Sequence, residues 1–112
     1  MKKIYIIIVI FLVALVACDK EKSGLSDCLD NKIKEFKNSE YACDNGANVK
    51  EYQFMGEKVY LFDPGLCGAD MFSEVIDGDC NFLGYLGGIA GITKINGTNF
   101  SEAVFIRVVW ER

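Results

Sequence analysis

The feature that most constrains what this chain can fold into is the apolar run at its N-terminus. Lys2 and Lys3 precede fourteen uncharged residues, 4–17, and charged residues 19–22 follow after Cys18. A membrane-spanning helix needs about 20 apolar residues, so this run is typical of a signal peptide. Its removal leaves 95 of the 112 residues. A chain of that length has room for a single domain.

The expected cleavage point, Leu15-Val16-Ala17-Cys18, resembles the lipobox of bacterial lipoproteins. The resemblance implies that Cys18 is the lipidation site, carries acyl chains such as palmitate and anchors the protein, because two or more chains give stable membrane attachment. An ordinary cleaved signal and an uncleaved anchor are the alternatives.

The residues after Cys18 bear on which membrane the anchor would enter. Asp19 resembles the inner-membrane retention signal of enteric bacteria, whereas the lysines and acids that follow resemble surface-export signals of Bacteroidota lipoproteins. We expect a location in the bacterial cell envelope, outside the cytoplasm, and leave the leaflet open.

After the signal, composition separates a short polar tether from a folded domain, and the net charge argues against a nucleic-acid partner. Residues 18–24 comprise the lipidated cysteine and a polar tether, and residues 25–112 form the expected domain. Without the signal the chain has 10 basic and 16 acidic residues, a net charge of −6. Nucleic-acid surfaces need clustered lysine and arginine, so we expect no nucleic-acid partner.

Four cysteines remain besides Cys18, namely Cys28, Cys43, Cys67 and Cys80. In a small exported domain an even number of cysteines indicates disulfides. We favour Cys28–Cys43 with Cys67–Cys80, because each closes a short loop, and keep Cys28–Cys67 with Cys43–Cys80 as the close alternative. The chain has no Cys-x-x-Cys and no histidine, which argues against zinc and against a redox-active thiol pair. We expect no metal and no cofactor.

The chain also lacks the common signatures of catalysis. A histidine base is excluded, and no serine, lysine or cysteine lies in a recognisable nucleophile motif. Four acids in loops around Cys67 and Cys80 would be brought together by a bridge between those cysteines: Asp63, Asp70, Asp77 and Asp79. Solvated turn acids are the simpler interpretation. We expect no enzyme; the alternative is a small envelope hydrolase or metal-dependent enzyme that uses loop carboxylates.

Hydrophobic periodicity predicts a helix over residues 25–37, capped by Ser26 or Asp27. Its apolar residues recur at steps of four, four and three, which places them on one face: Leu25, Leu29, Ile33 and Phe36. Such a stripe favours packing on a sheet.

Strand patterns and turn residues occupy most of the remaining chain. Residues 48–55 and 58–63 read as a hairpin joined near Gly56, and residues 74–77 and 81–86 as a second pair of strands. Residues 103–110 form the clearest strand, and Asn96-Gly97 predicts a turn after a short strand at 93–95. The glycine-rich stretch 84–91 lacks the spacing and the lysine of a phosphate loop, so we interpret its glycines as permitting tight turns or close backbone contact.

Aromatic side chains are the best candidates for a contact surface: Tyr41, Tyr52, Tyr60, Tyr85 and Trp110. Rings with polar groups suit a protein or glycan partner. Several of them alternate along strands, where they can instead belong to the core.

Five stretches of the domain form a recognisable pattern: Val49-Lys-Glu-Tyr52-Gln-Phe54, Val59-Tyr60-Leu-Phe62-Asp-Pro-Gly65, Leu66-Cys67-Gly-Ala-Asp70, Cys80-Asn-Phe-Leu-Gly84 and Leu86-Gly87-Gly88-Ile-Ala-Gly91. In these stretches the domain resembles a family of small uncharacterised lipoproteins found chiefly in Bacteroidota. The resemblance implies an envelope location and a compact disulfide-bearing fold, and it brings no catalytic residues.

Together these patterns predict an α+β domain, with an N-terminal helix packed on an antiparallel sheet of four to five strands and stabilised by disulfides. The role that fits best is a membrane-anchored, non-catalytic binding or accessory module for a protein or glycan.

Overall fold

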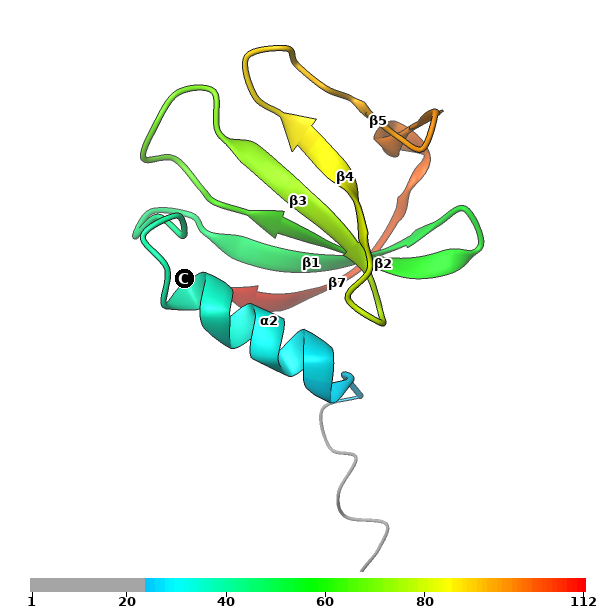
Figure 1. The fold of residues 1–112 in the computed structure, drawn as a ribbon, viewed down its shortest axis with the longest axis horizontal. Coiled ribbons are helices and arrows are strands. Elements are labelled where there is room, and N and C mark those ends of the chain that lie inside the picture. The colour runs from blue at the N-terminus through cyan, green and yellow to red at the C-terminus, as the bar shows by residue number, and fades with distance from the viewer. Residues whose placement is uncertain (1–23) are drawn as a thin grey trace, which may run out of the picture.

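The computed structural model describes residues 24–112, which form one α-helix, a five-stranded antiparallel sheet and a separate two-stranded sheet (Figure 1). Along the chain the elements are α2 (Asp27–Lys37), β1 (Asn48–Phe54), β2 (Glu57–Asp63), β3 (Phe72–Asp77), β4 (Phe82–Gly87), β5 (Lys94–Ile95), β6 (Thr98–Asn99), the 3-10 turn η2 (Phe100–Glu102) and β7 (Val104–Glu111). The main sheet has the order β4-β3-β2-β1-β7. The predicted fold class, a helix on an antiparallel sheet, is confirmed.

Three of the predicted features, the signal at 1–17, Cys18 and all of the tether except Gly24, lie outside the described residues. In the part of the chain that is described, no helix is both long enough and apolar enough to span a membrane.

Helix α2 begins where the sequence predicts a cap. The Ser26 hydroxyl accepts a hydrogen bond from the Leu29 N–H at 3.2 Å and donates one to the Gly78 carbonyl at 2.8 Å. The first bond satisfies an N–H that would otherwise have no partner at the start of the helix. The second bond ties the start of α2 to the turn between β3 and β4.

The two hairpin turns have the backbone that their residues favour. Met55 and Gly56 join β1 to β2 with φ of 50° and 82°, and Asn96 and Gly97 join β5 to β6 with the same two values. Two consecutive residues with positive φ fit the twist of a tight hairpin. The predicted turns near Gly56 and at Asn96-Gly97 are therefore confirmed.

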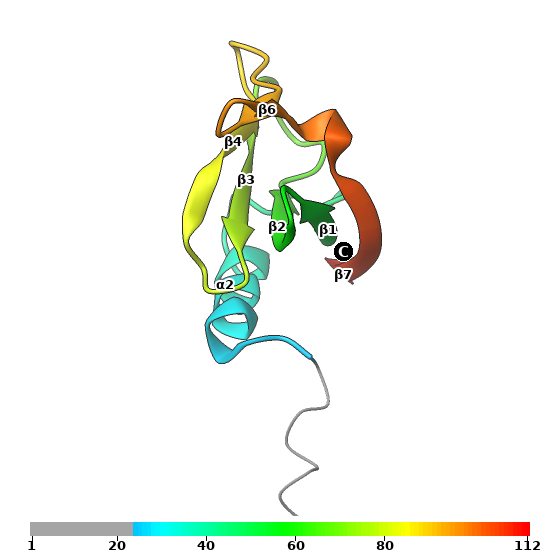
Figure 2. The same ribbon diagram turned by 90° about the vertical axis from the view of Figure 1, so that its right-hand side faces the viewer.

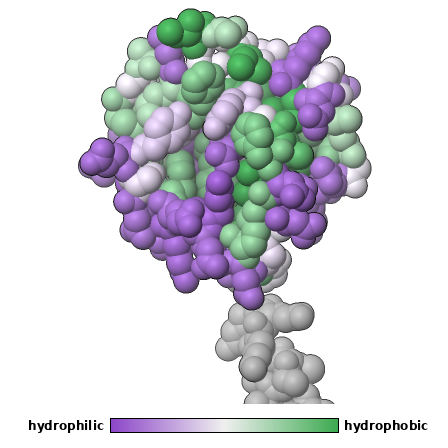
Figure 3. Space-filling view, viewed as in Figure 1, coloured by the Kyte–Doolittle hydropathy of each residue, from purple (hydrophilic) through white to green (hydrophobic). Residues whose placement is uncertain are grey.

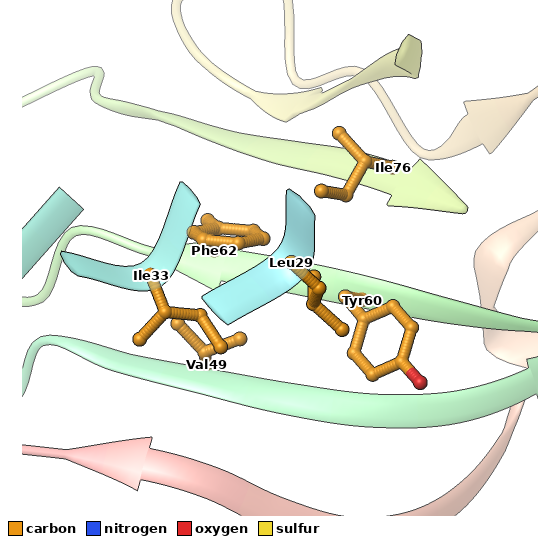
Figure 4. Packing of buried hydrophobic residues seen from close by; sticks show 6 residues of the cluster. All are labelled: Leu29, Ile33, Val49, Tyr60, Phe62 and Ile76. Atoms are coloured by element: carbon orange, nitrogen blue, oxygen red, sulfur yellow. The ribbon is translucent and has the colours of Figure 1, made fainter. Parts of the chain in front are cut away.

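The sheet is packed on both faces. On one face α2 covers β1, β2 and β3 through six buried residues: Leu29, Ile33, Val49, Tyr60, Phe62 and Ile76 (Figure 4). On the other face the crossover formed by β5, β6 and η2 covers a second buried cluster: Phe54, Val59, Val75 and Ile95. The sheet curls, so that β4 and β7 lie on opposite sides of β1 and β2 (Figure 2).

The disulfides join Cys28 to Cys80 and Cys43 to Cys67, with Cα–Cα distances of 6.3 Å and 5.6 Å. The prediction that these four cysteines form disulfides is confirmed, but both pairings considered from the sequence are wrong.

Rigid elements inside the supposed short loops explain the error. Cys28 lies in the first turn of α2 and Cys43 follows the end of that helix, whose 11 residues span about 16 Å. Cys67 and Cys80 lie beyond opposite ends of β3, whose six residues span about 20 Å. A disulfide needs Cα atoms within about 7 Å, so each cysteine pairs with one at its own end of the domain.

Candidate functional site

A groove of about 490 Å³ lies between α2 and the β3–β4 side of the sheet. Aromatic rings and a few charged groups line it, and we call it the aromatic groove: Lys32, Glu35, Phe36, Ser39, Tyr41, Phe62, Phe72, Glu74 and Tyr85. Its volume is within the range of small-ligand sites, which are about 300–1,000 Å³. The helix, the loop after it and three strands all contribute to it.

Exposed aromatic rings gather at the groove and beside it. Tyr41 is 43% exposed, Phe72 39% and Tyr85 45%, and neighbouring Phe82 is 55% exposed. The Tyr85 ring lies 5.3 Å from the Phe72 ring and 4.9 Å from the Phe82 ring, centroid to centroid. On the face seen in Figure 3, hydrophilic residues dominate the lower part, where α2 lies, and hydrophobic residues gather above it over the strands. Four partly exposed rings therefore lie at or beside this groove.

The chain holds two of these rings firmly. The Tyr41 hydroxyl donates a hydrogen bond to the Phe72 carbonyl and accepts one from the Phe72 N–H, both at 2.7 Å. Phe72 in turn packs on Gly88, whose φ is +72° and where a Cβ would overlap the Phe72 ring. Gly88 is therefore a position where a glycine permits close contact, as its place in the glycine-rich stretch 84–91 predicts.

Charged groups stand at the groove beside the rings. The Lys32 ammonium forms an ion pair at 2.9 Å with the Glu74 carboxylate, which joins α2 to β3. Glu35 is exposed one helical turn on from Lys32, and among the described residues its carboxylate has no hydrogen-bond or ion-pair partner. The groove thus combines apolar ring faces with two carboxylates and one ammonium group.

The structure divides the aromatic residues that the sequence singled out. Tyr41 and Tyr85 lie in the aromatic groove. Tyr60 is buried, Tyr52 contacts the Phe100 and Phe105 rings on another part of the sheet, and Trp110 is half-buried against Phe36. Two of the five predicted aromatic residues therefore line the groove, and the other three lie elsewhere.

Sequence reasoning missed Phe72, Phe82 and the Lys32–Glu74 pair. The third strand was expected to begin at Glu74, whereas β3 begins at Phe72, which pairs with Gly87. The signal available was alternation, because Phe72, Glu74 and Ile76 follow one another at every second residue and share a face.

The loop acids do not converge. The Asp77 carboxylate accepts hydrogen bonds from the Asp79 N–H, the Asn81 N–H and the Asn81 side chain, and Asp63 accepts one from the Gly65 N–H. Burial raises the pKa of Asp77, but the bonds from Asn81 and Asp79 outweigh it and leave that pKa below its usual value. Within residues 24–112, no three ligating side chains are grouped where they could hold a metal ion. Asp63 and Asp77 each stabilise a turn through these hydrogen bonds.

A buried polar cluster lies in the sheet, separate from the groove. The Glu51 carboxylate, 3% exposed, accepts hydrogen bonds from the Tyr60 hydroxyl at 2.7 Å and the Arg107 Nε at 2.9 Å. Burial raises the pKa of Glu51, but these two bonds and the Arg107 charge prevail and lower it. Burial and the bond to Glu51 raise the pKa of Tyr60 to about 12. The cluster joins β1, β2 and β7.

Comparison with known protein families shows which family the chain belongs to. A family model described as a domain of unknown function, DUF6970, matches residues 31–112. The chain belongs to the DUF6970 family. The expectation of an uncharacterised domain family is thereby confirmed. The match begins inside α2 and takes in every strand and every groove residue. Neither the curated proteins nor the solved structures contain a significant match.

Proposed function

We propose that this DUF6970 domain is a non-catalytic binding module that takes a protein or glycan partner in the aromatic groove. The observation that carries the proposal is the gathering of three exposed aromatic rings, those of Tyr41, Phe72 and Tyr85, at one hollow of about 490 Å³, with the exposed Phe82 ring beside Tyr85. Exposing such rings to water is unfavourable unless a partner covers them. Because Tyr41 and Phe72 are held in place, little order has to be imposed on binding.

The arrangement of carboxylates supports binding rather than catalysis. The carboxylates of the loop acids Asp63 and Asp77 accept hydrogen bonds from backbone N–H groups of their own turns. Glu51 and Tyr60, whose pKa values are shifted, are sealed in the sheet and satisfy one another. Shifted titratable groups indicate catalysis when they face a cleft, and these two do not line the groove. The hydrolase alternative has no such support.

We further propose that lipid on Cys18 holds the module at a membrane of the bacterial envelope, and that the protein is a lipoprotein of the Bacteroidota type. Support comes from the signal layout and the lipobox-like residues. The tether would join the domain at the N-terminal end of α2, whereas the groove lies along the C-terminal half of that helix. A tether at one end and the groove at the other would present the site away from the anchor.

The module is tested by binding of the purified protein to envelope fractions from its own source. We expect Tyr85→Ser to weaken binding because it removes an exposed ring of the groove. Phe105→Ser is the matched control, since Phe105 is a similarly exposed ring, 51%, on β7. Equal binding by the two variants and the unmodified protein would refute a role for the groove.

The anchor is tested by labelling cells with a tagged fatty acid. We expect the unmodified protein to take up label and the Cys18→Ala variant to lose both label and membrane association while the domain stays folded. Label retained by Cys18→Ala would overturn the anchor.

A further inference from the structure

We infer that the aromatic groove binds a neutral pyranose ring of a glycan. This inference rests on the proposed binding function and names its ligand class. A pyranose has one face of C–H groups and an edge of hydroxyls. The first needs a flat apolar surface, and the second needs hydrogen-bonding groups at its border.

The ring faces in the groove meet the first requirement. Phe72 and Tyr85 come from neighbouring strands, and their partly exposed rings lie 5.3 Å apart at a tilt of 46°. Phe82 extends the same surface, with its ring 4.9 Å from that of Tyr85. Aromatic side chains offer large, rigid apolar faces with few rotatable bonds. A sugar ring laid on them would remove its C–H groups from water.

The charged groups meet the second requirement. Hydroxyls donate hydrogen bonds well to carboxylates, and the Glu35 carboxylate lacks a partner among the described residues. Lys32 and Glu74 already neutralise one another at 2.9 Å, and each retains further hydrogen-bonding capacity toward a hydroxyl. Charge-assisted bonds of this kind fix orientation as well as adding affinity.

Charge also decides against anionic ligands. The groove has two carboxylates and one ammonium, and the chain without its signal carries a net charge of −6. Phosphate, sulfate or uronate groups would meet repulsion at Glu35, and the described residues that line the groove offer them no unpaired cation, because Lys32 is already paired with Glu74. A neutral sugar is compatible with both the rings and the carboxylates.

Size favours a sugar over a protein. A specific protein–protein contact covers about 800 Å² on each partner, much of it across a flat surface. The aromatic groove is instead a concave hollow bounded by α2 and the β3–β4 edge, and its walls are fixed by the Tyr41–Phe72 bonds and the Lys32–Glu74 pair. A preformed hollow of this volume suits one or two sugar rings.

The test is a panel of neutral oligosaccharides, including glucose, mannose, galactose and N-acetylglucosamine oligomers, with sulfated dextran as the anionic probe. The full-length protein in detergent is titrated with each by calorimetry, and saturation-transfer NMR locates the contacting sugar protons. We expect a neutral oligosaccharide to bind, with saturation strongest on its C–H face. Sulfated dextran should not compete.

Variants make the test specific. Tyr85→Ala should weaken sugar binding roughly tenfold, Tyr85→Phe should retain it because the ring remains, and Phe105→Ala should leave it unchanged. Glu35 lies on the exposed surface of α2, so Glu35→Gln should leave the fold unchanged. It should weaken binding of a neutral sugar, whereas it would strengthen binding of an anion.

The outcomes separate the ligand class from the binding function. If no neutral oligosaccharide of the panel binds, or if sulfated dextran binds better, the sugar inference is overturned. If envelope binding still depends on Tyr85 in that case, the binding function stands, and the partner is an anionic glycan where sulfated dextran binds and a protein where no sugar binds. If envelope binding is also indifferent to Tyr85, both proposals fail.

Discussion

Replacing Tyr60 by phenylalanine should destabilise the domain most near neutral pH, and the destabilisation should become smaller in both acid and alkali. The change removes the Tyr60 hydroxyl and leaves Arg107 as the remaining partner of the buried Glu51 carboxylate among residues 24–112. A hydrogen bond to a charged group contributes about 1.5–3 kcal/mol. We therefore expect Tyr60→Phe to lower the free energy of unfolding by that amount at neutral pH.

In acid the loss should shrink. The pKa of Glu51 is lowered in the folded protein, so its stabilising contribution is present above the pKa of the unfolded chain and is lost as pH falls through the folded pKa. The bond from Tyr60 is one cause of that lowering. Once Glu51 is protonated, the two proteins should differ less in stability.

In alkali the destabilisation caused by Tyr60→Phe should also become smaller. The pKa of Tyr60 is raised to about 12 in the folded protein, against about 10 in an unfolded chain. Stability from the neutral phenol is complete below about pH 10 and falls as pH rises toward 12, by about 2–3 kcal/mol in all. Tyr60→Phe has no phenol to ionise, so only the unmodified protein should lose this contribution.

Urea unfolding followed by circular dichroism, between about pH 4 and about pH 12, measures the difference in unfolding free energy between the two proteins. Other titrating groups are common to both and cancel. Tyr85→Phe is the control, since the Tyr85 hydroxyl bonds to no other described residue. This change should leave the free energy of unfolding nearly unaltered across the pH range. A difference that stays constant with pH, or that grows in alkali, would refute the reasoning.

Three further changes test the packing, the disulfides and the glycine contact. Leu29→Ala should cost about 2.7–5 kcal/mol in urea unfolding, because Leu29 is 1% exposed between α2 and the sheet; a loss under about 1 kcal/mol would contradict that packing. Replacing Cys28 and Cys80 together by serine should cost about 4 kcal/mol, since the bridge spans 52 residues, and peptide mapping without reductant should find this pair joined. Gly88→Ala should lower stability by roughly 1–3 kcal/mol through its positive φ and its overlap with Phe72, and unchanged aromatic NMR shifts would contradict that contact.

Local patterns were sufficient for most of the elements. The apolar stripe and the Ser26 cap predicted α2 to within two residues, because both act between residues three or four positions apart. The hairpin turn at Gly56 and the turn at Asn96-Gly97 were predictable because positive φ is a property of the turn residues themselves.

The candidate site was predictable only in part. Tyr41 and Tyr85 were named from the sequence, but so was Tyr60, which is buried against Glu51. Composition identifies rings that can form a contact surface, while their convergence depends on strand register and on where the loop after α2 lies. Alternation with Glu74 and Ile76 could have placed Phe72 in β3, but its position beside Tyr41 depends on a contact between residues far apart in the sequence.

What the sequence alone determined is the set of elements, since a helix stripe, strand alternation and turn chemistry are encoded within about ten residues of chain. Only the tertiary structure decided the pairing of the cysteines and the make-up of the aromatic groove. The pairing depends on rigid elements that lie between the cysteines, because α2 separates Cys28 from Cys43 and β3 separates Cys67 from Cys80. The groove depends on contacts between segments far apart in the chain, such as the Tyr41–Phe72 bonds. Separation along the chain therefore gave the wrong measure of distance in space.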